Sequence, residues 1–239
     1  MAVVVGAKGG LGAALYRALR AQARFQRVLS SGRPGSVGLS TDIEIDLDIE
    51  ITDESRIAAA AAAVGRLVDQ GIPLRLVIDA TGFLHGRGFE PEKSWRQLDA
   101  THMAHAFAIN AIGPALLMKY FLPLLARSGK AVFATLSAKV GSIGDNRLGG
   151  WYSYRASKAA LNQLVHTAAI ELARQKPQAV CVALHPGTVD TALSSRFAKS
   201  GLEVQQPDEA ATRLLAVIDS LGPKDTGGFF NHHGEPLPW

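Results

Sequence analysis

The sequence is poor in cysteine, aromatic residues and charge. Its 239 residues include a single cysteine, Cys181, so an intramolecular disulfide framework is excluded. Only 19% of the residues are charged and 7% are aromatic, whereas 47% are hydrophobic, which excludes a disordered chain and allows a sizeable core. We therefore expect one domain over residues 1–239, folded without disulfides in a reducing compartment, the cytoplasm.

Long hydrophobic runs and clusters of like charge are also missing. No stretch reaches the roughly eighteen unbroken apolar residues of a membrane span, and the short apolar N-terminus lacks the basic lead of a signal peptide. The 25 Lys and Arg outnumber the 21 Asp and Glu, but they are dispersed along the chain. This pattern predicts that the protein binds neither membranes nor nucleic acid, and a small phosphorylated ligand explains the basic balance equally well.

Four of the seven histidines form two close pairs in the sequence. His102 and His105 are three residues apart, and His232 and His233 are adjacent. No set of cysteines or carboxylates completes a metal shell around either pair, so we predict no metal site.

Short apolar runs alternate with longer stretches of helical periodicity. The composition of the runs predicts strands over residues 2–5, 27–30, 43–47, 74–79, 131–136, 179–184 and 227–231. The periodic stretches predict helices over residues 11–20, 52–68, 94–125, 153–174 and 208–221. Strands that alternate with helices form parallel crossovers, so the fold class is α/β with helices on both faces of the sheet.

A glycine-rich turn follows the first predicted strand and opens the first predicted helix. It consists of Gly6-Ala7-Lys8-Gly9-Gly10-Leu11-Gly12. Glycines let the backbone approach a pyrophosphate closely, and the free amides at a helix N-terminus attract its charge. The spacing departs from the common G-x-G-x-x-G, because Leu15 occupies the position of the third glycine counted from Gly10. Alone, the turn indicates either a dinucleotide site or a flexible connection.

A tyrosine and a lysine, Tyr154 and Lys158, are four residues apart in the helix predicted over residues 153–174. This spacing places the phenol and the ammonium on one helix face, where they can meet a common ligand. A phenol has a pKa near 10, and a nearby cation lowers that pKa by stabilising phenolate. Alone, the pair indicates either a proton donor or an exposed helix.

The two motifs together, in this order and at this separation, resemble the short-chain dehydrogenase/reductase family over almost the whole chain. Residues 141–146 and 149–162 are similar to its carbonyl-reductase-like subgroup, which contains the C-factor and sniffer proteins. The resemblance implies a Rossmann-type, doubly wound, seven-stranded parallel sheet. It also implies an NADP(H)-dependent oxidoreductase of a small carbonyl or alcohol substrate, assembled as a homodimer or homotetramer. An NAD(P)-binding signalling or partner-binding protein with little turnover is the alternative.

The resemblance assigns three catalytic residues directly. Tyr154 would protonate the carbonyl oxygen as hydride arrives, and Lys158 would hold the nicotinamide ribose while tuning the phenol. The family's asparagine matches Asn110, whose amide would hold a water near the lysine.

The catalytic serine and the substrate pocket leave alternatives open. The serine that orients the substrate carbonyl matches Ser137, although 17 residues separate it from Tyr154, where about a dozen are usual. Ser142 competes for this role, and a one-residue shift of the alignment would place Ala138 there. Trp151, just before the catalytic helix, is a further candidate for lining the substrate pocket.

The resemblance also assigns coenzyme contacts. They are Gly6, Lys8, Gly9, Gly10, Leu11, Gly12, Arg33, Glu50, Ile51, Ala80, Thr81, Gly82, Asn110, Tyr154, Lys158, Pro186, Gly187, Val189 and Thr191. The usual Asn-Asn-Ala-Gly after the fourth strand is Asp79-Ala80-Thr81-Gly82 here, and Glu50 replaces the usual aspartate.

The predicted coenzyme is NADP(H), with NAD(H) as the alternative. An acidic residue after the second strand would bind the ribose hydroxyls of NAD, but this segment is Ser30-Ser31-Gly32-Arg33. Arg33 and Lys8 could both reach an added phosphate, and a guanidinium binds that anion through paired hydrogen bonds.

Overall fold

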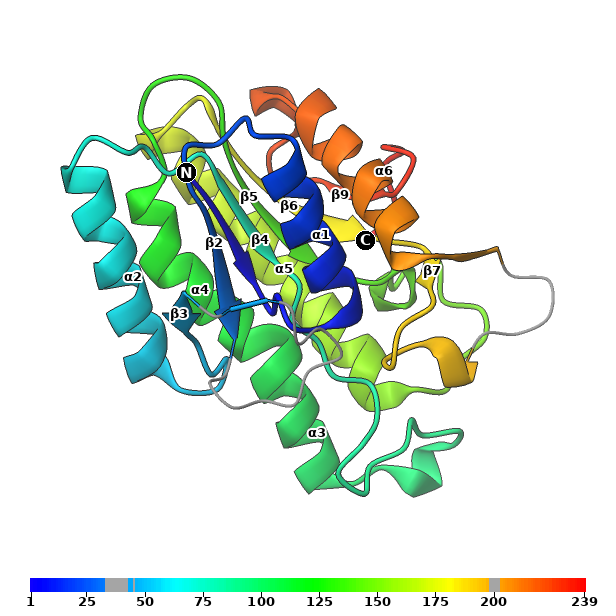
Figure 1. Cartoon of the computed structure of the whole chain (residues 1–239). Coiled ribbons are helices and arrows are strands. Elements are labelled where there is room, and N and C mark those ends of the chain that lie inside the picture. Colours follow the sequence, from blue (N-terminus) through cyan, green and yellow to red (C-terminus); the bar gives the residue numbers. More distant parts are fainter. Residues whose placement is uncertain (33–42, 45, 198–202) are drawn as a thin grey trace.

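Seven parallel strands form one sheet in the computed structural model, which describes residues 1–32, 43–44, 46–197 and 203–239 (Figure 1). In sheet order they are β3 (Leu47–Asp48), β2 (Val28–Gly32), β1 (Ala2–Val5), β4 (Leu76–Asp79), β5 (Ala131–Leu136), β6 (Ala179–His185) and β9 (Phe229–Asn231). The crossovers run outward in both directions from β1 and β4, which makes the carboxyl ends of these two strands the topological switch point. The predicted doubly wound, seven-stranded sheet is confirmed.

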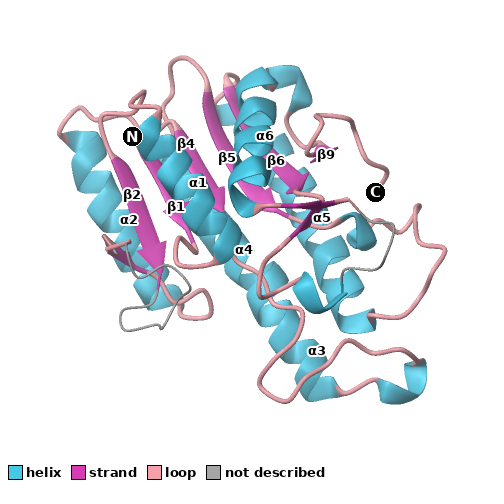
Figure 2. Cartoon of the chain, turned by 45° about the vertical axis from the view of Figure 1, so that its right-hand side comes forward, coloured by secondary structure: helices cyan, strands magenta, loops and turns pink. Residues whose placement is uncertain are grey.

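Helices cover both faces of the sheet, because alternate strand residues point to opposite sides (Figure 2). Val3 and Val5 of β1 belong to the core on one side, and Ala2 and Val4 to the core on the other. The first core lies under α2 (Glu54–Asp69), α4 (Gly113–Phe121) and α5 (Tyr152–Gln175). The second lies under α1 (Gly10–Ala21) and α6 (Pro207–Ser220).

The helix predicted over residues 94–125 is interrupted in the structure. A 3-10 turn, η1 (Trp95–Gln97), precedes α3 (Ala100–Phe107), which begins after Asp99 because the Asp99 carboxylate accepts a hydrogen bond from the amide of His102 at 2.7 Å. A π-helical turn, η2 (Ala108–Ile112), joins α3 to α4, and η3 (Leu122–Leu124) ends the segment. Residues Ala100–Leu124 are long and apolar enough to cross a membrane, a criterion that core helices of soluble proteins also meet.

The edge strand predicted over residues 43–47 was wrong in extent, because β3 comprises only Leu47 and Asp48. The Asp46 carboxylate accepts hydrogen bonds from the amide and hydroxyl of Ser30, at 2.7 and 2.9 Å. These side-chain bonds replace the ladder bonds that a longer strand would make with β2. The predicted bounds of the other strands and of α1, α2, α5 and α6 agree with the structure within two residues.

Short elements complete the chain. A two-stranded parallel sheet that the sequence did not predict pairs β7 (Thr188–Val189) with β8 (Val204–Gln205). The remaining 3-10 turns are η4 (Lys139–Gly141), η5 (Ser195–Phe197) and η6 (Pro223–Asp225). The β7 strand and η5 follow the carboxyl end of β6, so they border the site described next.

Candidate active site

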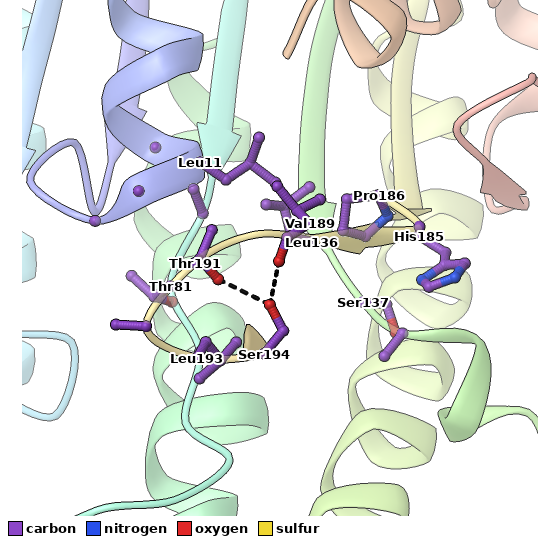
Figure 3. A pocket seen from close by; sticks show the side chains of 18 of the residues that line it. Leu11, Thr81, Leu136, Ser137, His185, Pro186, Val189, Thr191, Leu193 and Ser194 are labelled. Atoms are coloured by element: carbon purple, nitrogen blue, oxygen red, sulfur yellow. Dashed lines mark hydrogen bonds between the residues drawn. The ribbon is translucent and has the colours of Figure 1, made fainter. Parts of the chain in front are cut away.

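The carboxyl ends of β1, β4, β5 and β6 surround a cavity of about 460 Å³ (Figure 3). Its wall consists of Lys8, Gly9, Gly10, Leu11, Gly12, Ala80, Thr81, Gly82, His85, Leu136, Ser137, Ala138, Tyr154, Lys158, His185, Pro186, Gly187, Val189, Thr191, Ala192, Leu193 and Ser194. Ligands of open α/β sheets bind at this edge, beside the topological switch point. The structure therefore brings the glycine turn and the Tyr154–Lys158 pair to one cavity.

The glycine turn is tightly folded against its neighbours. Gly6 has a φ of +81°, a conformation that L side chains rarely adopt. A Cβ atom on Gly12 would overlap the carbonyl oxygen of Gly6, and a Cβ on Gly10 would lie 2.9 Å from Cγ2 of Thr191. Gly9 is the N-cap of α1 and has no side chain to occupy the first amides of that helix. The turn thus presents backbone amides and a positive helix end to the cavity, which suits an anionic group.

Tyr154 and Lys158 lie on the face of α5 that borders the cavity. The Lys158 ammonium is 6.0 Å from the centroid of the Tyr154 ring and donates a hydrogen bond of 2.8 Å to the carbonyl oxygen of Leu136. Burial raises the pKa of Tyr154 above its ordinary value. Burial also lowers the pKa of Lys158 to about 8, against the opposing effect of the Asp79 charge. Both shifts arise because a low-dielectric environment disfavours the charged form.

Asp79 links the ends of β4 and β5 through its side chain. Its Oδ1 accepts hydrogen bonds from the amide and hydroxyl of Thr81, at 3.0 and 2.6 Å. Its Oδ2 accepts a hydrogen bond of 2.7 Å from the hydroxyl of Thr135 on β5. The carboxylate therefore holds the β4 end against β5 and shapes the loop that lines the cavity.

Asn110 lies in the π-helical turn η2, fully buried beside the cavity. Its amide oxygen accepts a hydrogen bond from the amide of Phe83 at 2.7 Å, and its amide nitrogen donates to Phe83 O at 2.8 Å and to Ser157 Oγ at 3.0 Å. A Cβ on Gly82 would lie 3.8 Å from Asn110 Oδ1 and 3.9 Å from Lys158 Nζ, so the asparagine is close to the lysine. Its side chain ties the loop after β4 to helix α5, and the expected water contact stays a prediction.

The two candidate serines occupy different places. Ser137 borders the cavity at the end of β5, next to His185 at the end of β6, and its hydroxyl donates a hydrogen bond of 2.6 Å to Oδ1 of Asn162. The described cavity wall does not include Ser142. The Ser142 hydroxyl instead donates to the carbonyl oxygen of Trp239 at 3.2 Å and accepts from the amide of Asp145 at 3.1 Å. This geometry favours Ser137 over Ser142 for a substrate contact.

Other predicted contacts lie outside the described wall of the cavity. Ile51 is buried and packs against Gly113 of α4, and Glu50 accepts a hydrogen bond of 3.3 Å from the hydroxyl of Thr52. Trp151 stands next to the wall, with its ring edge-to-face with Tyr154 at a centroid distance of 6.2 Å. Arg33, the predicted phosphate contact, lies outside the described residues.

The structure adds wall residues that the sequence did not indicate. They are His85, Leu136 and His185. His85 Nε2 is 3.0 Å from the carbonyl oxygen of Ala192, which joins the loop after β4 to the segment after β7. Burial lowers the pKa of His185 to about 4, so its imidazole is neutral at neutral pH. The sequence does contain an indication that His185 lies at the site, because this polar residue follows an apolar run and directly precedes Pro186.

Cys181 and the histidine pairs contribute no reactive centre of their own. Within the described part of the chain, no three His, Cys, Asp or Glu side chains are placed to hold a metal ion. Cys181 is buried in β6, and burial raises the pKa of its thiol to about 12. The thiol is therefore protonated and unreactive at neutral pH.

Comparisons with known proteins agree over most of the chain. A family model described as enoyl-(acyl carrier protein) reductase matches residues 17–219. The 1-hydroxy-2-glutathionyl-2-methyl-3-butene dehydrogenase of Rhodococcus sp. strain AD45 is 30% identical over 242 residues, which cover 99% of this chain and 98% of the relative. The C-signal protein of Myxococcus xanthus is 37% identical over 144 residues, which cover 59% of this chain and 81% of the relative.

Solved structures match the fold along its full length. The NADPH-bound carbonyl reductase from chicken fatty liver has a TM-score of 0.84 and 29% identity, and the match covers 100% of this chain and 93% of that one. The carbonyl reductase Sniffer of D. melanogaster has a TM-score of 0.81 and 25% identity, over 99% and 98% of the two chains.

Proposed function

The chain belongs to the short-chain dehydrogenase/reductase family, and from this premise we propose that it is an NADP(H)-dependent oxidoreductase of a small carbonyl or alcohol substrate. The observation that carries the proposal is that Tyr154 and Lys158 share one cavity with the glycine turn of α1. The proposed proton donor would thus lie beside the proposed site for an anionic dinucleotide, as hydride transfer to a carbonyl requires.

The cavity fits the coenzyme. The uncovered amides of residues 10–12 would hold the pyrophosphate, residues 80–82 would lie along the adenine ribose, and Lys158 would hold the nicotinamide ribose. Pro186, Val189 and Thr191 would contact the carboxamide. When bound, the nicotinamide supplies or accepts the hydride.

A preference for NADP(H) has two supports. Lys8 lies on the cavity wall, beside the turn that would bind the phosphates. The similar chicken carbonyl reductase is bound to NADPH. Arg33 lies outside the described residues, and its contact with the extra phosphate stays a prediction from the sequence.

Tyr154 would act as the general acid in reduction and the general base in oxidation. The phenol is protonated at neutral pH and would donate its proton to the carbonyl oxygen as negative charge develops there. Burial raises its pKa, opposite to the lowering expected from the sequence, so the donor depends on a neighbouring cation to stabilise the phenolate. The Lys158 ammonium, anchored on Leu136 O, stabilises the phenolate that remains. The Ser137 hydroxyl would orient the carbonyl by turning its proton from Asn162 to the substrate.

A screen of ketones, aldehydes and quinones with NADPH or NADH, each at the same low concentration, tests this function. We expect coenzyme oxidation, measured by absorbance, to be faster with NADPH, and we expect Tyr154→Phe to slow it by about 1,000-fold. Faster turnover with NADH would contradict the coenzyme assignment.

A signalling or partner-binding role is the second candidate function, and the observation that favours it is the similarity to the C-signal protein. Under this hypothesis the protein would bind NADPH without turning over any carbonyl in the screen. Tight coenzyme binding, measured by fluorescence titration, with no coenzyme oxidation across the panel would select this role over catalysis.

A further inference from the structure

A buried carboxylate, Glu92, lies against the first turn of α5, the helix that carries Tyr154 and Lys158. The Glu92 side chain is 2% exposed. Its Oε2 accepts a hydrogen bond of 3.2 Å from the amide of Ser153, and its Oε1 accepts one from the Ser153 hydroxyl. The carbonyl oxygen of Glu92 also accepts a hydrogen bond of 2.5 Å from the amide of Trp151. One residue of the loop after β4 thus holds the start of a helix that begins some sixty positions later in the chain.

Helix α5 needs this contact because its own sequence supplies no cap. The N-cap residue is Trp151, whose indole cannot accept a hydrogen bond and whose φ of +53° lies in the left-handed region. The first turn holds no acidic residue. The first amides of a helix lack intrahelical partners, and the N-terminus of a helix favours a negative charge. From outside the helix, the Glu92 carboxylate supplies both an acceptor for the amide of Ser153 and an acidic group at the N-terminus of α5.

His102 extends the contact to helix α3. Its Nδ1 is 3.2 Å from Oε1 of Glu92, and both side chains are buried. The His102 ring stacks on Phe89 at a centroid distance of 4.8 Å and meets Phe83 edge-to-face at 6.1 Å. The backbone of Phe83 is bonded on both its amide and its carbonyl to Asn110. The cluster therefore joins the surroundings of Asn110 to the start of α5.

We propose that Glu92 is a positioning residue for Tyr154. Ser153 immediately precedes Tyr154, so the two hydrogen bonds to Glu92 fix where α5 begins and, with it, the direction of the phenol. The described cavity wall does not include Glu92, so it acts through the helix rather than on the substrate. The catalytic part of this inference rests on the proposed oxidoreductase function. A displacement of the reacting group by about 1 Å can cost on the order of 100-fold in rate.

The test compares Glu92→Ala with Glu92→Gln by kinetics and by hydrogen–deuterium exchange. We expect Glu92→Ala to lower kcat by about tenfold or more, with the Kd of NADPH within about twofold of wild type, because only the phenol is displaced. The amide of Ser153 should exchange about tenfold faster, since it loses its acceptor. Glu92→Gln keeps an oxygen for that amide and should return kcat to within about threefold of wild type.

Glu54→Gln is the matched control. Glu54 accepts hydrogen bonds from Lys119 and Tyr120 between α2 and α4, away from the cavity. We expect this loss of a carboxylate charge to leave both kcat and the exchange of Ser153 unchanged. If Glu92→Ala does not fold, Ser153→Ala removes only the hydroxyl contact and should lower kcat by about threefold, with NADPH binding retained.

Three kinetic or binding results would overturn the proposal: wild-type kcat in Glu92→Ala, equal losses of kcat and NADPH affinity in Glu92→Ala, or no recovery of kcat in Glu92→Gln. A Ser153 amide that stays protected in Glu92→Ala would also overturn it, whether or not the protein is catalytic. A wild-type protein that turns over no carbonyl would instead contradict the proposed function, so the two failures are distinguishable.

Discussion

The hydroxyl of Ser137 at the end of β5 donates a hydrogen bond of 2.6 Å to Oδ1 of Asn162, two helical turns after Tyr154. Tyr154, Lys158 and Asn162 follow one another at four-residue spacing, so they share one face of α5. The single proton of Ser137 is engaged with the asparagine, while its oxygen keeps lone pairs that can accept. Asn162 thus determines which way the serine hydroxyl points before a carbonyl arrives.

Replacing the two candidate serines separately distinguishes their roles. We expect Ser137→Ala to lower kcat/KM by about 10- to 100-fold, because a hydroxyl on the cavity wall is lost. Ser142→Ala should lower it by less than about threefold and lower the Tm instead, because Trp239 O and the amide of Asp145 lose a shared partner. Steady-state kinetics and thermal unfolding measure the two effects. A larger kinetic loss in Ser142→Ala would reverse the assignment.

Tyr154→Phe removes the proposed proton donor and leaves the aromatic ring. We expect kcat to fall by about 1,000-fold, within the range for general acid catalysis, because no other hydroxyl occupies that position on α5. The Kd of NADPH, measured by fluorescence titration, should stay within about threefold of wild type. Retained turnover would show that another group supplies the proton.

The fold was predictable where apolar patterns and strand lengths agree. The run at Ala2–Val5 alternates between the two cores, as a strand of a covered parallel sheet must. The edge strand β3 was mispredicted because Asp46 bonds to Ser30 by its side chain, which the alternation of apolar and acidic residues does not reveal. The start of α3 was mispredicted because the apolar period continues across Asp99.

The site was predictable where the backbone itself makes the contact. The turns after β1, β4 and β6 follow from strand ends and glycines, and their residues line the cavity. His85 was missed because its placement depends on the pairing of two loops distant in sequence. Glu92 was missed for the same reason, since its partner Ser153 lies on another element.

Two glycine-to-alanine substitutions contrast the turn with an ordinary helix position. A Cβ on Gly12 would overlap the carbonyl oxygen of Gly6, so we expect Gly12→Ala to distort the turn and weaken NADPH binding by about tenfold or more. A Cβ atom on Gly65 in α2 would contact only Leu124 Cδ2, at an ordinary van der Waals distance of 3.7 Å. Gly65→Ala should therefore raise the free energy of unfolding by about 0.5–1 kcal/mol without changing NADPH binding. Unchanged binding in Gly12→Ala would exclude close approach of the coenzyme at this turn.

Lys158 makes the stability of the protein depend on pH in a specific window. Burial lowers its folded-state pKa from 10.5 to about 8, so the unfolded chain binds this proton more tightly than the folded one. The resulting destabilisation is complete below about pH 8 and disappears as the pH rises through the unfolded-state pKa. Across this window the wild type should gain up to about 3 kcal/mol of unfolding free energy from this group.

Lys158→Met lacks the titrating group, so its stability should not show this gain. The variant also leaves Leu136 O without its donor, but that loss is independent of pH. Both proteins are unfolded with urea at about pH 7 and about pH 10. The free energy of unfolding of wild type, relative to that of the variant, should be larger at the higher pH. Other groups titrate in both proteins and cancel in the comparison. A constant difference would show that the ammonium is solvated. The expected gain would mean that the fold keeps a charged lysine beside Tyr154 at the expense of stability, as the proposed catalysis requires.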